Sequence, residues 1–180
     1  LKAMSAMQDA HLSIDDSPDI TVMDIRSKCR RLKMEKGLDL ITIDYLQLMS
    51  APGGSSGGNS SGGENRQQQV SGMTRALKGL ARELDVPVIV LSQLNRAAEV
   101  RTEHRPIMSD LRESGSIEQD ADLVMFLYRD AYYNETADNM SEVILAKQRN
   151  GPTGTVKLLW QGQYTRFMNP AAQWQEDAAQ

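Results

Sequence analysis

A helical pattern between two short apolar stretches constrains the fold more than any other part of the sequence. The first stretch, residues 38–44, follows Gly37 and is apolar or β-branched between Asp39 and Asp44, and the second covers residues 86–93. Residues 64–84 carry apolar side chains at helical spacing, namely Val70, Met73, Leu77, Leu80, Ala81 and Leu84. A helix between two buried strands predicts a βαβ unit and therefore a parallel sheet.

Polar side chains end both predicted strands. Asp44 ends the first strand, and Gln93 ends the second. Open α/β sheets bind ligands at the carboxyl ends of their strands, so we expect both residues at one ligand-binding edge. In nucleotide hydrolases a carboxylate in this position holds Mg²⁺, usually through water. An aspartate that only caps a turn would give the same pattern.

The composition fits a single domain and restricts its class. The 180 residues, 40% hydrophobic, are enough for one globular domain, which we place over residues 1–168, and no apolar run is long enough to span a bilayer. The formal charge of −4 argues against a surface built for duplex DNA, although it allows a local basic lining. A single cysteine, Cys29, excludes an internal disulfide and indicates a reducing compartment.

The segments around the βαβ unit have clear local signals. A helix is predicted before the first strand, where Thr21 and Asp24 would cap its start and Gly37 would end it. Residues 11–16 alternate like a short strand. Six of the thirteen glycines fall within residues 51–63, which predicts a flexible loop; it lacks the Gly-Lys-Ser/Thr ending of a P-loop. Residues 169–180 are predicted to be an unstructured tail.

The C-terminal third of the sequence predicts strands and a β-hairpin. Strands are expected over residues 123–128 and 142–149, and the second turns at residues 150–154, returns over residues 155–160 and leads to a last short strand within 163–167. Lys147 and Arg149 are two residues apart, so they share one face of their strand. Adjacent cations repel unless an anion lies between them. The pair either binds an anion or only keeps the sheet edge soluble.

Four segments, in this order, carry a resemblance to a known family: residues 40–49, 90–96, 109–122 and 146–152. The most specific is Arg-Glu-Ser-Gly-Ser-Ile-Glu-Gln-Asp-Ala-Asp over residues 112–122, where Ser109 can cap a short helix that Gly115 breaks. Together these segments resemble the bacterial replicative DNA helicases of the DnaB family. The resemblance covers nearly the whole sequence, from residue 10 to residue 168.

The resemblance implies an α/β fold with a RecA-like P-loop NTPase core, in which helices flank a mostly parallel sheet and a β-hairpin follows. It implies a cytoplasmic ring of six subunits that binds ATP and Mg²⁺, hydrolyses ATP, translocates on single-stranded DNA and unwinds the fork during DNA replication. A helicase loader and primase are the expected partners, and no membrane is expected.

The resemblance also implies roles for single residues at the nucleotide. Asp44 matches the Walker B acid that holds Mg²⁺ through water, and Gln93 matches the sensor that touches the γ-phosphate. Arg149 matches the arginine finger and Lys147 its neighbour, and both would act on the ATP of the adjacent subunit by stabilising charge in the transition state. This role favours the anion-binding explanation of the cation pair.

A second group of residues matches the part of the family that holds DNA. Arg112, Glu113 and Gly115 match the loop that contacts the DNA backbone. Small residues and backbone N–H groups can approach phosphates, and arginine supplies a fixed fork of donors. Glu113 cannot pair with a phosphate, so we expect it to orient Arg112. Arg66 follows the Gly/Ser segment, which faces the central channel in the family, and could reach a phosphate.

Two features depart from the family, the Gly/Ser segment over residues 51–63 and the lack of a P-loop motif, and the second matters more. No Gly-x-x-x-x-Gly-Lys-Ser/Thr motif occurs in the 180 residues. We expect the P-loop and the catalytic glutamate upstream of Leu1, so that the chain is truncated on its N-terminal side and is inactive alone. The alternative is a non-catalytic module that binds single-stranded DNA or a partner on a RecA-like scaffold. An aromatic content of only 5% argues against it, because single-strand binding usually relies on stacking.

Overall fold

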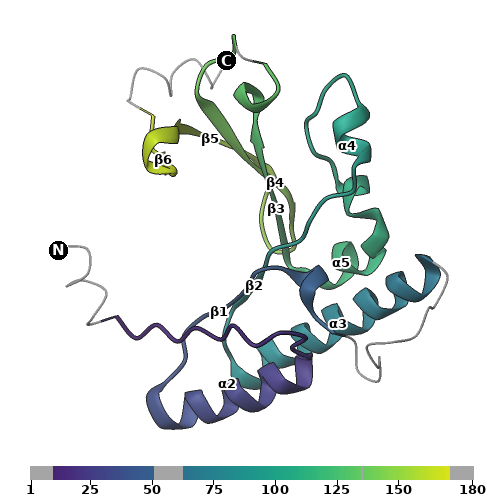
Figure 1. Cartoon of the computed structure of the whole chain (residues 1–180), viewed down its shortest axis with the longest axis vertical. Coiled ribbons are helices and arrows are strands. Elements are labelled where there is room, and N and C mark those ends of the chain that lie inside the picture. Colours follow the sequence, from purple (N-terminus) through teal and green to yellow (C-terminus); the bar gives the residue numbers. More distant parts are fainter. Residues whose placement is uncertain (1–9, 51–62, 135, 171–180) are drawn as a thin grey trace.

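The computed structural model describes residues 10–50, 63–134 and 136–170, and it describes residues 63–66 and 112–115 by their backbone only. The predicted loop over residues 51–63 lies outside this range except for Gly63, and so does the predicted tail from residue 171 onward. Figure 1 shows a helical layer, formed by α2 and α3, from which an antiparallel sheet extends. No helix in the described ranges is both long and apolar enough to cross a membrane.

The first described helix, α2 (Val22–Lys36), begins and ends where the sequence predicts. The Thr21 hydroxyl accepts a hydrogen bond from the Asp24 N–H at 3.2 Å, and the Asp24 carboxylate accepts one from the Thr21 N–H at 3.0 Å. Gly37 follows the helix with φ of 83°, a conformation that favours glycine. The strand predicted over residues 11–16 is wrong, because this segment is irregular and exposed and pairs with no described strand.

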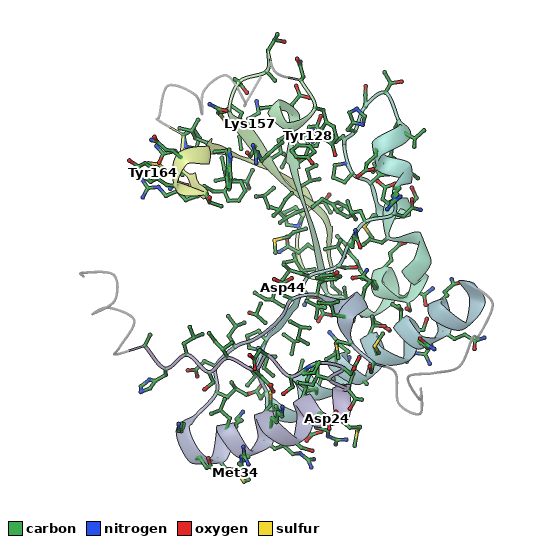
Figure 2. All side chains as sticks on the ribbon, viewed as in Figure 1. Asp24, Met34, Asp44, Tyr128, Lys157 and Tyr164 are labelled. Atoms are coloured by element: carbon green, nitrogen blue, oxygen red, sulfur yellow. The ribbon has the colours of Figure 1, made fainter. Side chains whose placement is uncertain are left out.

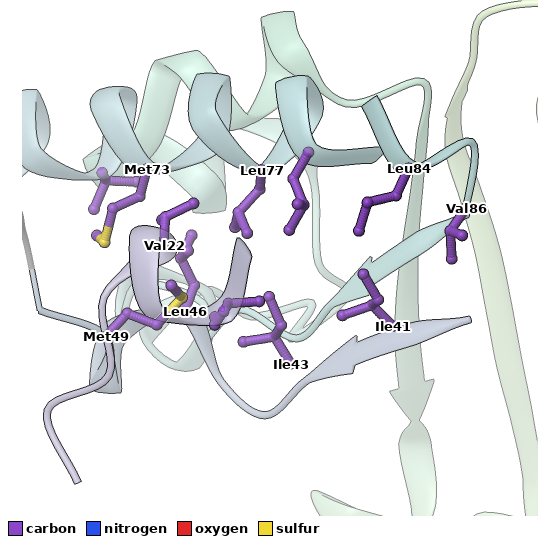
Figure 3. Packing of buried hydrophobic residues seen from close by; sticks show 12 residues of the cluster. Val22, Ile41, Ile43, Leu46, Met49, Met73, Leu77, Leu84 and Val86 are labelled. Carbon is purple, nitrogen blue, oxygen red and sulfur yellow. The ribbon is translucent and has the colours of Figure 1, made fainter. Parts of the chain in front are cut away.

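The predicted βαβ unit is confirmed. Strands β1 (Ile41–Ile43) and β2 (Val88–Val90) pair in parallel, with Ile41 opposite Val88, and α3 (Gly63–Leu84) connects them. The apolar stripe of α3 packs on the strands and on α2 (Figure 3). The buried residues of this cluster are Val22, Ile25, Ile41, Ile43, Leu46, Met49, Val70, Met73, Leu77, Leu80, Leu84 and Val86.

Only one face of the parallel pair is buried. Ile41 and Ile43 point into the cluster, whereas Thr42 between them is exposed, and Ile89 is 45% exposed. The sequence predicts two buried strands, whereas the described strands are buried on one face only, because α2 and α3 cover the same face. The alternating pattern is therefore that of a half-buried sheet.

The remaining strands form an antiparallel sheet in the order β3-β4-β5-β6. They are β3 (Leu123–Arg129), β4 (Met140–Gln148), β5 (Gly154–Gln161) and β6 (Arg166–Met168). The predicted hairpin between β4 and β5 is confirmed. The predicted mostly parallel sheet is wrong for the described strands, among which β1 and β2 are the only parallel pair. Consecutive strands joined by short connections must run antiparallel, since a parallel connection needs a dozen or more residues.

Short helices lie in the connections between the strands. The 3₁₀ helix η1 (Leu46–Leu48) follows β1, and α4 (Ala97–Val100) follows β2. The 3₁₀ helix η2 (Met108–Ser114) changes to α5 (Gly115–Asp120) at the glycine that was expected to break a helix. Ile117 of α5 packs against the first cluster and against a second one formed by Leu111, Val124 and Phe126. Two further 3₁₀ turns are η3 (Asp130–Tyr132) and η4 (Gly162–Tyr164).

Candidate nucleotide and DNA site

The loops that follow β1 and β2 are held together at one edge of the parallel sheet. The Leu91 N–H donates a hydrogen bond to the Ile43 carbonyl at 2.9 Å, and the Leu46 N–H donates one to the Leu91 carbonyl at 2.9 Å. Asp44 lies between these two contacts in the chain and is exposed. Figure 2 shows it in the middle of the molecule, between the helical layer and the antiparallel sheet. Gln93, also exposed, lies in the facing loop.

Gln47 joins the two loops through its side chain. Its amide nitrogen donates to the Ser92 hydroxyl at 3.0 Å, and its amide oxygen accepts from the Gln93 N–H at 3.2 Å. These bonds fix the backbone of Gln93 beside the loop that carries Asp44. No role was predicted for Gln47 from the sequence. Its only signal is an amide side chain two residues after Tyr45, within an otherwise apolar segment.

The Asp44 carboxylate has the chemistry that a hydrated Mg²⁺ needs. Among the described residues, none donates a hydrogen bond to it, and no group of three or more His, Cys, Asp or Glu side chains gathers to hold a metal ion. A single exposed carboxylate fits Mg²⁺ that keeps most of its water and takes its other ligands from phosphate oxygens. The residues present therefore fit a metal that is shared with a nucleotide.

Lys147 and Arg149 lie together, as their spacing predicts, at the C-terminal end of α5. The Lys147 ammonium donates to the Glu118 carbonyl at 2.5 Å. The Arg149 guanidinium donates to the Gln119 carbonyl at 3.1 Å through Nη2, and its Nε is 3.1 Å from a carboxylate oxygen of Asp122. The two cations thus already contact two carbonyl oxygens and one carboxylate of their own chain. No side-chain pattern could indicate the two carbonyl groups.

The segment between α5 and β3 is also anchored to α3. The Thr74 hydroxyl donates to the Asp120 carboxylate at 2.7 Å, and Lys78 forms an ion pair with Asp122. Burial, and the nearby cations Arg82, Arg149 and Lys147, lower the pKa of Lys78. Asp122 therefore pairs with Lys78 from α3 and with Arg149 just after β4. No role was predicted for Asp122 beyond its place in the family segment.

The residues matched to DNA binding lie on η2, α5 and α3. The structure describes the backbone of Arg112, Glu113 and Gly115 and that of Arg66, while their side chains lie outside the described part. Arg112, Glu113 and Gly115 thus fall at the junction of η2 and α5, at the opposite end of α5 from the carbonyls that Lys147 and Arg149 contact.

Asp110 fixes the start of η2 and was not predicted from the sequence. Its side chain is 2% exposed. The carboxylate accepts a hydrogen bond from the Arg101 guanidinium at 2.5 Å and one from the Ile107 N–H at 2.8 Å. Its carbonyl accepts a bond from the Asn95 N–H at 3.0 Å. A buried carboxylate with these partners holds η2 and the loop after β2 in one arrangement.

A groove of about 570 Å³ lies at the far end of β3, away from the cation pair. Tyr133 stacks on His104 with ring centres 4.0 Å apart. The Tyr128 hydroxyl donates to Asp130 at 2.9 Å, and burial together with this hydrogen bond raises the pKa of Tyr128 to about 12. Nothing in the sequence pattern indicated the groove, because its walls come from the loop before η2 and from both ends of the β3–β4 connection.

The sequence matches one family and several relatives. It matches the DnaB-like helicase C terminal domain over residues 1–169. The replicative DNA helicase DnaB of Geobacillus stearothermophilus is 58% identical over 169 residues, which are 93% of this chain and 36% of that helicase. The replicative DNA helicase DnaC of Bacillus subtilis strain 168 is 55% identical over 93% of this chain and 36% of its own length. The chain thus spans about a third of the length of these relatives.

Two solved structures resemble this chain and point to the same family as these relatives. A solved ATPase domain superposes with a TM-score of 0.84 at 44% identity, over 94% of this chain and 58% of that domain's chain. A DnaB-like replicative helicase, described with its interactions with primase, gives the same TM-score and identity over 94% of this chain and 41% of the helicase. The described elements are a mixed α/β arrangement that matches these helicase ATPase domains, and this chain belongs to the DnaB-like helicase C-terminal domain family.

Proposed function

We propose that this chain is part of a hexameric, ATP-dependent replicative DNA helicase, which translocates on single-stranded DNA and unwinds the fork in the cytoplasm. The observation that carries the proposal is the arrangement of four side chains in a chain of this family. Asp44 and Gln93 follow adjacent parallel strands, and Lys147 and Arg149 lie together at the end of β4. A helicase loader and primase are the proposed partners; a similar solved helicase is described with primase.

Two of these residues would act at the nucleotide of their own subunit. Asp44 would hold Mg²⁺ through water, and Gln93 would contact the γ-phosphate from the facing loop. The metal ion, when bound, would neutralise charge that develops on the phosphates. Gln47 would keep the two loops at a fixed separation through its hydrogen bonds to Ser92 and Gln93.

The cation pair would act on the ATP of the adjacent subunit. Arg149 would donate to the γ-phosphate oxygens and stabilise the charge of the transition state, and Lys147 would add positive potential beside it. Arg149 retains this capacity. Arg149 is 49% exposed, and none of the described residues accepts a hydrogen bond from its Nη1.

The DNA would be held through its phosphates. Arg112 and Gly115 would contact the backbone at the junction of η2 and α5, with Glu113 orienting Arg112, and Arg66 would add a contact from the start of α3. Such binding depends strongly on salt concentration and little on base sequence.

The 180-residue chain alone would neither bind ATP tightly nor hydrolyse it. Its sequence has no Gly-x-x-x-x-Gly-Lys-Ser/Thr motif, so it lacks the backbone cradle and the lysine that hold the β- and γ-phosphates in P-loop enzymes. Metal-dependent ATP turnover by the purified chain would contradict this part of the proposal.

The test replaces the matching segment of the G. stearothermophilus DnaB helicase with this chain. In this chimeric helicase, Arg149→Ala should lower the kcat for ATP about 10³-fold or more, as expected for an arginine finger. Arg166→Ala is the matched control, because Arg166 is exposed and bonds only within its own hairpin among the described residues. Unchanged turnover in an intact Arg149→Ala hexamer would overturn the proposed role of Arg149.

Mixing variants tests whether the cation pair acts between subunits. Asp44→Asn and Arg149→Ala hexamers should each be inactive for different reasons. If the two residues serve one site across a subunit boundary, mixed rings contain some sites with a native Asp44 and a native Arg149. Mixing should then restore part of the ATP turnover, and a complete lack of restoration in rings shown to be mixed would place both residues in one subunit's site.

A further inference from the structure

Asp122 lies where three parts of the chain meet. Its carboxylate Oδ1 is 3.1 Å from Nε of Arg149, and its carbonyl accepts a hydrogen bond from the Arg149 N–H at 2.8 Å. The other carboxylate oxygen pairs with Lys78 of α3. Asp122 therefore contacts Arg149 at both its backbone and its side chain. Figure 1 shows the nearby helix α5 beside the ends of β3 and β4.

These contacts orient the guanidinium group of Arg149. An arginine side chain has five N–H donors in a rigid, planar fork. Here Nε forms an ion pair with the Asp122 carboxylate and Nη2 donates a hydrogen bond to the Gln119 carbonyl, so two edges of the plane have partners from their own chain. Nη1, which has no acceptor among the described residues, is left to meet a ligand from outside the chain.

Stability is a weak explanation for this arrangement. The Asp122 side chain is 56% exposed and that of Arg149 is 49% exposed. Ion pairs between side chains this exposed typically contribute no more than about 1 kcal/mol, because water and salt screen them. Screening weakens the energy of the ion pair more than it weakens the orientation of the Arg149 guanidinium, because two contacts on one planar group still restrict its direction.

We propose that Asp122 is a positioning residue for Arg149: it holds the guanidinium so that Nη1 faces the nucleotide of the adjacent subunit. The inference rests on the function proposed above and adds a residue to that site. Lys78 holds the second carboxylate oxygen and thereby fixes Asp122 against α3. Because Gln119 belongs to α5 and Asp122 follows its C-terminal end, a movement of α5 would be transmitted to Arg149.

The experiment measures ATP turnover by the chimeric helicase with saturating poly(dT). Asp122→Ala should lower kcat about 10- to 100-fold, the range expected when a catalytic group is misplaced by about 1 Å, and should leave KM for ATP within about twofold. Asp122→Asn keeps an oxygen acceptor for Nε and should recover part of this loss. Each variant is first shown to be hexameric by gel filtration.

Asp120→Ala is the matched control. Asp120 belongs to the same segment and bonds to Thr74 of α3, but among the described contacts it forms no hydrogen bond or ion pair with Arg149. If Asp120→Ala and Asp122→Ala lower kcat equally, the effect is a general loosening of α5 and the inference is overturned. An Asp122→Ala enzyme with raised turnover in the absence of DNA would also overturn it, because Asp122 would then restrain Arg149 away from the nucleotide.

A double variant separates this inference from the proposed function. If Asp122 acts through Arg149, Asp122→Ala should cause no further loss in an Arg149→Ala background. A full additional loss in the double variant would overturn the positioning role. If Arg149→Ala itself has no effect, the proposed function of Arg149 fails; if Arg149→Ala is inactive and Asp122→Ala is normal, only the positioning inference fails.

Discussion

At the scale of single residues, the side chains with evident chemistry were predictable and their partners were not. Asp44, Gln93, Lys147 and Arg149 have functional groups whose place at strand ends can be inferred from the chain order. Their partners include carbonyl groups of α5 and the amide of Gln47. Every residue carries a carbonyl, and a glutamine within an apolar run gives no positional signal, so these contacts required the tertiary structure.

The half-buried phenol of Tyr128 predicts a specific pH dependence of stability. Its pKa is raised from 10.0 to about 12 by burial and by its hydrogen bond to Asp130. The folded chain thus keeps a proton that the unfolded chain loses, so the stabilisation is complete below pH 10 and is lost as the pH rises towards 12. The free energy of unfolding in urea should therefore fall more steeply above pH 10 than in Tyr128→Phe.

The control for this titration is Tyr132→Phe. Tyr132 neighbours Tyr133 in the same aromatic group but is 75% exposed. Its substitution should leave the slope of stability against pH unchanged. Equal slopes for the native chain and Tyr128→Phe as the pH rises from 10.0 to about 12 would show that this phenol does not control the profile there.

At the scale of elements, local signals predicted where helix α2 begins and ends, and non-local pairing decided which segments form strands and in which direction they pair. The cap at Thr21 and the stop at Gly37 act within a few residues, so α2 was correct at both ends. Residues 11–16 also alternate, yet a strand needs a neighbour, and Leu12 and Ile14 remain 64% and 82% exposed. The family resemblance implies a mostly parallel sheet, but the short connections between β3 and β6 require antiparallel pairing of the described strands.

The Asp110 carboxylate should control the stability of the 3₁₀ helix η2. Asp110→Ala would leave the Arg101 guanidinium and the Ile107 N–H without their buried acceptor. Breaking such a pair should lower the free energy of unfolding by about 3 kcal/mol. Chemical denaturation monitored by circular dichroism measures this loss. Asp138→Ala is the control, because Asp138 accepts only a bond from the Met140 N–H among the described residues.

The consequence for function follows from the position of η2. Arg112 and Glu113 belong to this helix. Loosening it should therefore also weaken the binding of single-stranded DNA by the chimeric helicase. Affinity for an oligo(dT) strand should fall more for Asp110→Ala than for Asp138→Ala at the same salt concentration. Equal losses in stability and in DNA affinity for both variants would mean that Asp110 has no special role in holding η2.

At the scale of the whole molecule, substitutions on the two faces of β3 should differ in how much stability they cost. Val124 and Phe126 are 7% and 4% exposed and pack under α5, whereas Leu123, Met125 and Leu127 are 42%, 50% and 65% exposed. Phe126→Ala should cost about 3–5 kcal/mol of stability, because it removes buried apolar area and leaves a cavity. Adjacent apolar side chains that stay exposed in this chain form a surface on which apolar molecules can bind.

Substitution on the exposed face should therefore remove binding without unfolding the chain. The double variant Met125→Thr/Leu127→Thr places β-branched residues in the strand and should change stability by no more than about 0.5 kcal/mol. It should also lower the fluorescence of a bound hydrophobic dye and the tendency of the purified chain to self-associate in sedimentation experiments. A loss of stability as large as that of Phe126→Ala would instead show that both faces of β3 are covered in solution. The contrast between neighbouring residues of β3 therefore tests directly whether the sheet is buried on one face only.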